Sequence, residues 1–244
     1  MIAVTKIMSH RLLVPVLLGL LAFGGAILSF TLGGYGLLVM TLIALTTVVC
    51  SGLNILIGLS GQISFGHVAF YAIGAYVSAL MLMAGAPLVL AMAMAIVATA
   101  ALGALLAIPG VRVSGPYLAM VTIAFSFIVH HSLIEWRSVT GGSNGLAGVP
   151  MPGTGDLPAD TGLALIAISL MVVSLVFFHR LKGSGWGRAM RSVKATEIAA
   201  RSLGFNPVHT KTLAFSLSAL FAGVAGSLLS PLMMFISPES FPFT

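Results

Sequence analysis

Residues 88–108 have the sequence LVLAMAMAIVATAALGALLAI, which contains no charged side chain. The hydrocarbon core of a membrane is crossed by roughly 20 helical residues, so this stretch predicts a transmembrane helix. Six further stretches of similar length contain almost no charge: 12–30, 37–57, 65–84, 115–134, 162–179 and 213–236. Continuous apolar runs of this length favour helices over a membrane β-barrel, whose segments of about ten residues alternate in polarity. We therefore predict an all-α integral membrane protein with about seven transmembrane helices.

The composition of the whole chain supports this prediction. Of 244 residues, 59% are hydrophobic and only 7% are charged, whereas about a quarter of a soluble globular domain is charged. Small residues let helices approach closely in lipid. Two i,i+4 pairs, Ala219 with Gly223 and Ala222 with Gly226, therefore predict a packing face on the last helix. The single cysteine, Cys50, excludes a disulfide or a cysteine metal site within the chain.

The basic residues predict the orientation of the helices. Seven of the 11 lysines and arginines lie in segment 180–211: Arg180, Lys182, Arg188, Arg191, Lys194, Arg201 and Lys211. Positively charged loops stay on the cytoplasmic side of a membrane, which places this segment and the N-terminus inside and loop 135–161 outside. The net charge of +6 is thus explained by topology rather than by nucleic-acid binding. The first apolar run is longer than the 7–15 residues of a typical signal-peptide core, so we expect it to be retained as a helix.

A glycine-rich block between the second and third runs has two interpretations. Gly58, Gly61 and Gly66 lie among polar residues, and this mixture weakens a helix. A broken helix at membrane depth lines a cavity or is buried in protein, so the block is a candidate lining of a translocation path. The candidates are Asn54, Gly58, Ser60, Gly61, Gln62, Ser64, Gly66 and His67. The alternatives are an ordinary cytoplasmic turn and, for each polar side chain, a hydrogen bond between helices worth about 0.6 kcal/mol.

The basic segment 180–211 contains a second candidate site. Residues 194–203 are helix-forming with interspersed charges, and Gly204 and Pro207 follow. Glycine is common directly after a helix and proline shortly beyond it. The pattern predicts a short helix at the membrane surface that ends before Gly204. An inert basic surface loop is the alternative.

Four blocks of sequence, in this order, resemble the permease subunits of branched-chain amino-acid ABC importers, and their spacing suits the M-type subunit. The blocks are Asn54–His67 continuing to Gly74–Tyr76, Tyr117–Thr122 with Thr140–Leu146, Gly187–Arg191 leading through Glu197–Ala200 to Gly204, and Ile236–Phe241. The resemblance spans the chain from about residue 54 to residue 243. It implies a single permease domain over 1–244, with a cytoplasmic coupling loop at 180–211 and a periplasmic loop at 135–161.

The resemblance also implies partners and a substrate class. In such importers two different permeases pair in the bacterial inner membrane, two ATPases bind beneath them and a periplasmic protein delivers leucine, isoleucine or valine. Close relatives transport urea or short amides. The pattern Glu-x-Ala-Ala-x-x-x-Gly resembles the motif that contacts the ATPase, which implies this role for Glu197, Ala199, Ala200 and Gly204. Family members generally continue beyond the segment matching 236–243, so the chain is expected to be C-terminally short of the full fold.

The sequence contains no Gly-x-x-x-x-Gly-Lys-Ser/Thr motif. We therefore expect ATP to bind partner chains, and no cofactor, metal or catalytic residue in this one. Three other functions stay open. An ion-driven transporter usually needs ionisable residues within its spans, and here only histidines and the boundary residue Glu135 qualify. An intramembrane enzyme would need a nucleophile–base or paired-carboxylate arrangement, which the sequence lacks. A membrane scaffold that transports nothing is the third.

Overall fold

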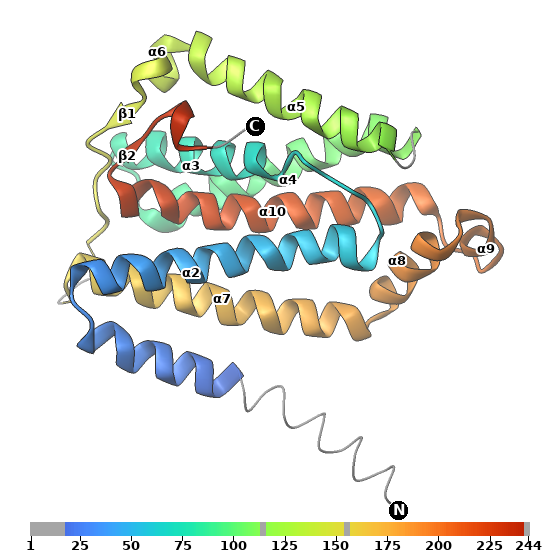
Figure 1. Cartoon of the computed structure of the whole chain (residues 1–244), viewed down its shortest axis with the longest axis horizontal. Coiled ribbons are helices and arrows are strands. Elements are labelled where there is room, and N and C mark those ends of the chain that lie inside the picture. The colour runs from blue at the N-terminus through green and yellow to red at the C-terminus, as the bar shows by residue number, and fades with distance from the viewer. Residues whose placement is uncertain (1–17, 113–115, 154–156, 242–244) are drawn as a thin grey trace, which may run out of the picture.

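The computed structural model describes residues 18–112, 116–153 and 157–241 (Figure 1). The chain is an all-α membrane protein, as predicted. Its long helices are α2 (Gly34–Leu53), α3 (His67–Met83), α4 (Leu88–Arg112), α5 (Pro116–Glu135), α7 (Ala159–Gly183) and α10 (Pro207–Met233). The short elements are the π-helix η1 (Asn54–Leu59), α6 (Arg137–Thr140), η2 (Gly142–Asn144), α8 (Gly185–Ala195), α9 (Glu197–Ser202) and η3 (Pro238–Ser240). Strands β1 (Leu146–Ala147) and β2 (Phe235–Ile236) form one antiparallel pair.

Every predicted run contains an apolar helix, although not all of these helices have the length of a full crossing. In the described part of the chain, five helical stretches are long and apolar enough to cross a membrane: 34–59, 88–109, 117–135, 159–183 and 207–233. Two further apolar helices, Leu18–Thr31 and His67–Met83, are shorter. The first of these lies in the predicted run 12–30, whose residues before 18 are outside the described part.

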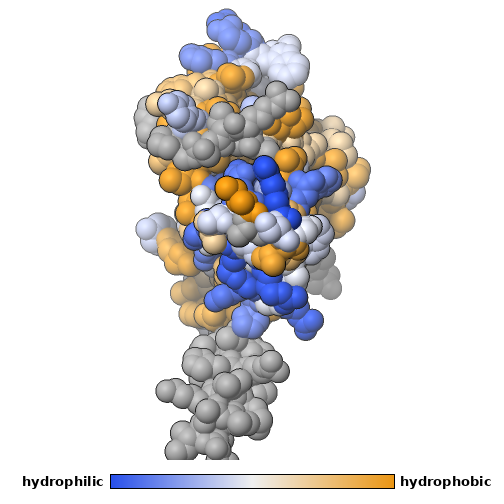
Figure 2. Space-filling view, turned by 90° about the vertical axis from the view of Figure 1, so that its right-hand side faces the viewer, coloured by the Kyte–Doolittle hydropathy of each residue, from blue (hydrophilic) through white to orange (hydrophobic). Residues whose placement is uncertain are grey.

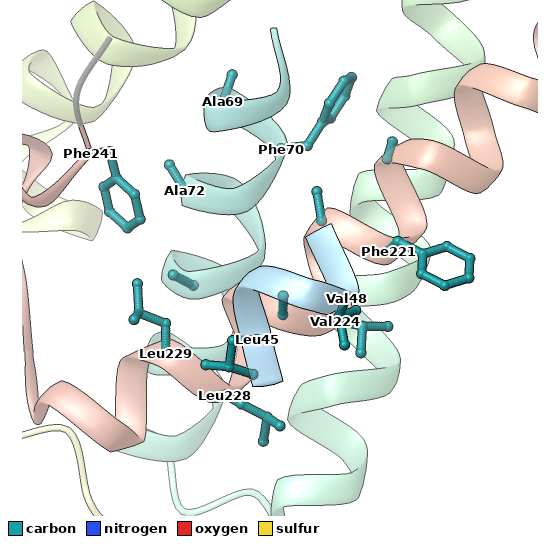
Figure 3. Packing of buried hydrophobic residues seen from close by; sticks show 14 of the residues in the cluster. Leu45, Val48, Ala69, Phe70, Ala72, Phe221, Val224, Leu228, Leu229 and Phe241 are labelled. Atoms are coloured by element: carbon teal, nitrogen blue, oxygen red, sulfur yellow. The ribbon is translucent and has the colours of Figure 1, made fainter. Parts of the chain in front are cut away.

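Helix α10 lies at the centre of the bundle and packs against α2, α3 and α4. Buried leucine, valine, alanine and phenylalanine side chains from α2, α3 and α10 fill the space between these helices (Figure 3). The predicted small-residue face of α10 is confirmed. A Cβ at Gly103 would lie 2.6 Å from Ala219 Cβ, and one at Gly74 would lie 2.7 Å from Gly223 Cα. The helix backbones therefore meet at distances that leave no room for a larger side chain.

The two ends of the bundle differ in charge. Figure 1 shows α2 and α7 running together toward α8 and α9, and α10 returning from there toward β2. All seven basic residues of 180–211 belong to the end that carries α8 and α9, which we call the basic end. The opposite end carries α6, β1 and β2 together with Glu135, Asp160 and Glu239. The segments predicted to lie inside and outside the membrane are thus at opposite ends of the bundle, and which end faces the cytoplasm stays a prediction.

Two local predictions in segment 194–211 were wrong. The expected single helix over 194–203 is divided, because Thr196 has an extended backbone (φ −157°, ψ 134°) that ends α8 before α9 begins. The last long helix starts earlier than predicted, because Pro207, which lies beyond the short helix as expected, is itself the first residue of α10, where its missing N–H is no loss. The Asn206 side chain caps this helix by accepting a hydrogen bond of 2.9 Å from the Val208 N–H. Helix α10 consequently begins before the predicted residue 213.

Candidate functional site at the basic end

Helix α2 changes its winding at Asn54. Residues Asn54–Leu59 form a π-helical turn, and the N–H of Ser60 bonds to the Ile55 carbonyl five residues earlier at 3.2 Å. Such turns add one residue to a helix and occur frequently at functional sites. The Asn54 side chain lies over this turn, because an added Cβ at Gly58 would meet its oxygen Oδ1.

The segment after the π-helical turn is a tight, buried connection to α3. The Ser60 hydroxyl donates to the Leu56 carbonyl at 2.7 Å and accepts from Gln62 Nε2 at 2.8 Å. The Ser64 hydroxyl accepts from the Gly66 N–H at 3.2 Å. Within the described part of the chain, Gln62 Oε1 is buried and has no hydrogen-bond partner. The block is thus a turn at the basic end whose polar side chains mostly face the protein.

His67 begins α3 and lies in a polar contact between three helices. Its Nε2 is 3.0 Å from the hydroxyl of Ser218 on α10, and that hydroxyl donates to the Gly52 carbonyl of α2 at 2.7 Å. Because the hydroxyl proton is directed to Gly52, Nε2 carries the hydrogen in the contact with Ser218. His67 therefore makes a hydrogen bond between helices, which was the alternative to lining the translocation path.

The path candidates separate into a buried and an exposed group. Ser60, Gln62, Ser64, Gly66 and His67 are buried within the chain. Asn54 and Gly61 are exposed, and Gly58 is half-buried. Asn54 shares an outward face of α2 with two further exposed side chains, Thr46 and Cys50, at intervals of four residues. This face was not recognised in the sequence, although its spacing was visible there.

Helix α9 is held against the start of α10 by an ion pair. Glu197 Oε1 lies 2.6 Å from Lys211 Nζ, and Glu197 Oε2 lies 3.8 Å from Arg201 Nη2. Ala200 is fully buried, whereas the side chain of Ala199 is outside the described part. Gly204 ends the segment with φ +81° and open space around it, as expected of a glycine directly after a helix. Of the four predicted coupling residues, Glu197 pairs with Lys211 and Ala200 is buried inside this chain, whereas Gly204 is exposed.

Large apolar side chains project into solvent around α9. Ile198 is 81% exposed, Leu203 67% and Trp186 of α8 54%. A cavity of about 460 Å³ between α8 and the start of α10 is lined by Trp186, Phe205 and His209 among others. Figure 2 looks onto this end and shows hydrophilic and hydrophobic residues mixed across its centre. Exposed apolar residues outside the bundle and rimmed by charge are typical of a surface that binds another protein.

One contact joins the two candidate regions. Lys194 of α8 extends to the end of the π-helical turn, where Nζ lies 2.8 Å from the Gly58 carbonyl oxygen and 3.5 Å from that of Ile57. The sequence indicated no individual role for Lys194, which is one of the seven basic residues of segment 180–211. A contact across 136 residues has no local signal that could have indicated it.

A central helix packed through small residues, a π-helical turn next to it and a short amphipathic segment outside the bundle define the chain as a multi-pass membrane protein with one specialised end. Residues 35–244 match the family described as "Branched-chain amino acid transport system / permease component". The chain belongs to this family.

Two curated relatives extend this finding. Both are described as "High-affinity branched-chain amino acid transport system permease protein LivM". The protein of Salmonella typhimurium strain LT2 is 38% identical over 218 residues, covering 79% of this chain and 51% of the relative. The protein of Escherichia coli strain K12 is 37% identical over 231 residues, covering 84% of this chain and 54% of the relative. The chain thus spans about half the length of these relatives. No solved structure matches it.

Proposed function

We propose that the chain is a permease subunit of an ABC importer for leucine, isoleucine and valine. The observation that carries this proposal is the match of residues 35–244 to the permease family. The arrangement at the basic end supports it, because α9 stands outside the bundle with Ile198 and Leu203 exposed. A second permease would complete the translocation path, two ATPases would bind the basic end and a periplasmic protein would deliver substrate at the opposite end.

The location follows from the same proposal. Five of the described helical stretches are apolar and long enough for a membrane, and the basic end is the cytoplasmic one by the charge rule. We therefore propose that the chain lies in the bacterial inner membrane with its N-terminus in the cytoplasm. ATP is bound by the partner ATPases, and this chain contributes the contact through Glu197, Ala199 and Gly204. Ala200, the fourth residue of the predicted motif, is fully buried and supports α9 from inside the chain.

We infer that the outward face of α2 borders the translocation path. Asn54 is exposed there, and no hydrogen bond of its side chain occurs within the described part of the chain. A polar side chain on an outward membrane face is costly in lipid but not beside water or a partner helix. The ammonium and carboxylate groups of an amino acid need hydrogen-bond partners during passage, and a break in helical bonding can provide them.

Co-purification from native membranes tests the assembly. We expect this chain to bring down two ATPases and a second permease, and proteoliposomes containing the complex to take up leucine only with ATP. Isoleucine and valine should compete with leucine, whereas competition by urea or acetamide would identify the amide branch of the family. Recovery of the chain without an ATPase, or uptake driven by an ion gradient alone, would contradict the proposal.

The coupling contact has a matched pair of variants. Gly204 and Gly85 both have φ +81° and nothing within 4 Å of an added Cβ, and they lie on different connections. Aspartate tolerates this backbone region better than most residues, so neither variant should unfold. We expect Gly204→Asp to abolish ATP-driven uptake and Gly85→Asp to preserve it. Equal uptake by the two variants would remove Gly204 from the ATPase contact.

A further inference from the structure

Lys194 connects α8 to the end of the α2 helix. Its ammonium donates to the Gly58 carbonyl at 2.8 Å and approaches the Ile57 carbonyl at 3.5 Å. The last carbonyls of a helix carry the negative end of the helix dipole, and the Ile57 carbonyl already accepts from the Gly61 N–H at 3.2 Å. The lysine therefore caps the π-helical turn from a different part of the chain.

The stem of the same side chain makes a second contact. Gly61 turns the backbone with φ +72°, and a Cβ at this position would lie 2.7 Å from Lys194 Cγ. The backbone after the π-helical turn thus passes directly over the methylene groups of Lys194. The ammonium bonds to the turn while the stem supports the residue three positions later, so α8 and the turn are joined at two points.

Helices α8 and α9 are linked by a very short connection. Lys194 lies in the last turn of α8, and the extended residue Thr196 separates it from the start of α9 at Glu197. Helix α9 is itself fastened to α10 by the 2.6 Å contact between Glu197 and Lys211. A displacement of α9 can therefore reach the bundle by two routes, through Lys211 to α10 and through Lys194 to α2.

We propose that Lys194 is a positioning residue that transmits the movement of α8 and α9 to the π-helical turn. The proposal rests on the proposed function, because it takes α9 as the segment moved by the ATPase. At the other end of this route, the turn begins with Asn54, the exposed polar residue of the α2 outward face. Lys194 thereby links the ATPase contact to the residue that borders the path.

The amount of leucine taken up per ATP hydrolysed by the reconstituted complex is the quantity that tests this role. We expect Lys194→Met to lower that ratio by about fivefold or more, the range of ordinary coupling between sites, while the complex assembles and hydrolyses ATP. Lys194→Arg keeps a cation near the carbonyls and should retain most of the ratio. Lys182→Met, at an exposed lysine on the end of α7, is the control and should match the unaltered protein.

Two results would overturn the proposal. One is an unchanged ratio in Lys194→Met. The other is an equal loss in Lys194→Met and Lys194→Arg that follows the amount of assembled complex, because a purely structural role predicts it. If the unaltered complex lacks ATP-dependent uptake, the proposed function fails instead, so the two failures are distinguishable.

A covalent link supplies an independent test should Lys194→Met not assemble. A Cβ at Gly61 would lie 3.4 Å from Lys194 Cβ, close to the separation in a disulfide. In a Cys50→Ser background, the pair Gly61→Cys and Lys194→Cys should therefore couple when oxidised and lose coupling when dithiothreitol reduces the bond. Full coupling in the reduced form, or none in the oxidised form, would show that this connection transmits nothing.

Discussion

Lys211 Nζ lies 2.6 Å from Glu197 Oε1, and this pair joins the short helix α9 to the first turns of α10. Lys211 is only 7% exposed, so its charge depends on this partner for compensation. The side chain of Glu197 remains 37% exposed. Glu197, the acidic residue of the proposed coupling motif, therefore orients α9 within its own chain, and its exposed surface is available to the proposed partner.

Loss of Glu197 should destabilise the protein more than loss of Lys211. Glu197→Gln leaves a buried ammonium without a counter-charge, and we expect it to lower the free energy of unfolding by about 1–3 kcal/mol, because partial exposure reduces the cost of a fully buried pair. Lys211→Met removes the buried charge itself and should cost less. Thermal unfolding of the purified protein in detergent measures both.

Arg201→Gln is the matched control for the same carboxylate. Arg201 Nη2 lies 3.8 Å from Glu197 Oε2 with its side chain 67% exposed, so its loss should change stability by about 0.5 kcal/mol or less. A Glu197→Gln variant no less stable than Arg201→Gln would show that Lys211 finds another partner.

The crossing of α3 and α10 should tolerate no added methyl group. A Cβ at Gly74 would lie 2.7 Å from both the Cα and the carbonyl oxygen of Gly223, and backbone atoms cannot turn away as a side chain can. We expect Gly74→Ala to destabilise the bundle by about 1–3 kcal/mol through overpacking. Melting temperature and monodispersity in detergent report this.

Gly24→Ala provides the comparison, because Gly24 also lies in an apolar helix but has nothing within 4 Å of an added Cβ. Alanine has a higher helix propensity than glycine, so this variant should be as stable as the unaltered protein or slightly more stable. Equal behaviour of the two variants would mean that α3 and α10 separate easily at this crossing.

The elements that follow from local chemistry were predictable. Apolar runs locate the helices because the bilayer requires a minimum length of uncharged residues, and the pairs Ala219–Gly223 and Ala222–Gly226 located the packing face of α10. Gly204 was correctly placed directly after a short helix. Each of these features depends on residues that are close to one another in the sequence.

The remaining features depend on contacts between distant residues. The glycine-rich block predicted a weakened helix near Gly58, but it gave no indication that the turn beginning at Asn54 would be π-helical. After the break at Thr196, Glu197 pairs with Lys211 of α10, and no pattern within 194–203 indicates that pairing. Burial likewise divided the glycine-rich block, since Ser60 and Gln62 bond to each other while Asn54 faces outward.

Ser218→Ala should remove two hydrogen bonds, because a single hydroxyl group makes both. The hydroxyl donates to the Gly52 carbonyl at 2.7 Å and lies 3.0 Å from His67 Nε2, so its loss removes one partner from a buried polar group on each of two other helices. We expect a cost of about 1–2 kcal/mol. A double-mutant cycle with His67→Leu should show that the two changes are not additive.

Ser169→Ala is the reference variant for this measurement. The Ser169 hydroxyl bonds only to the Leu165 carbonyl of its own helix at 2.8 Å and is exposed, so its removal should leave stability nearly unchanged. Additive effects of Ser218→Ala and His67→Leu would instead mean that the contact between them contributes nothing.

Cys50 is the only cysteine of the chain and reports on the environment of the α2 outward face without any substitution. It lies between Thr46 and Asn54 on that face, and a thiol reacts with maleimides as the thiolate, which forms in water and not in lipid. We expect a membrane-impermeant maleimide to label Cys50 in the assembled complex, and leucine to slow the labelling.

A cysteine at position 97 in a Cys50→Ser background is the lipid-facing control, because Val97 is 63% exposed on the apolar helix α4. Mass spectrometry of this chain should find Val97→Cys unmodified. Labelling of Val97→Cys but not of Cys50 would place the path elsewhere and leave the α2 face against lipid or a partner helix.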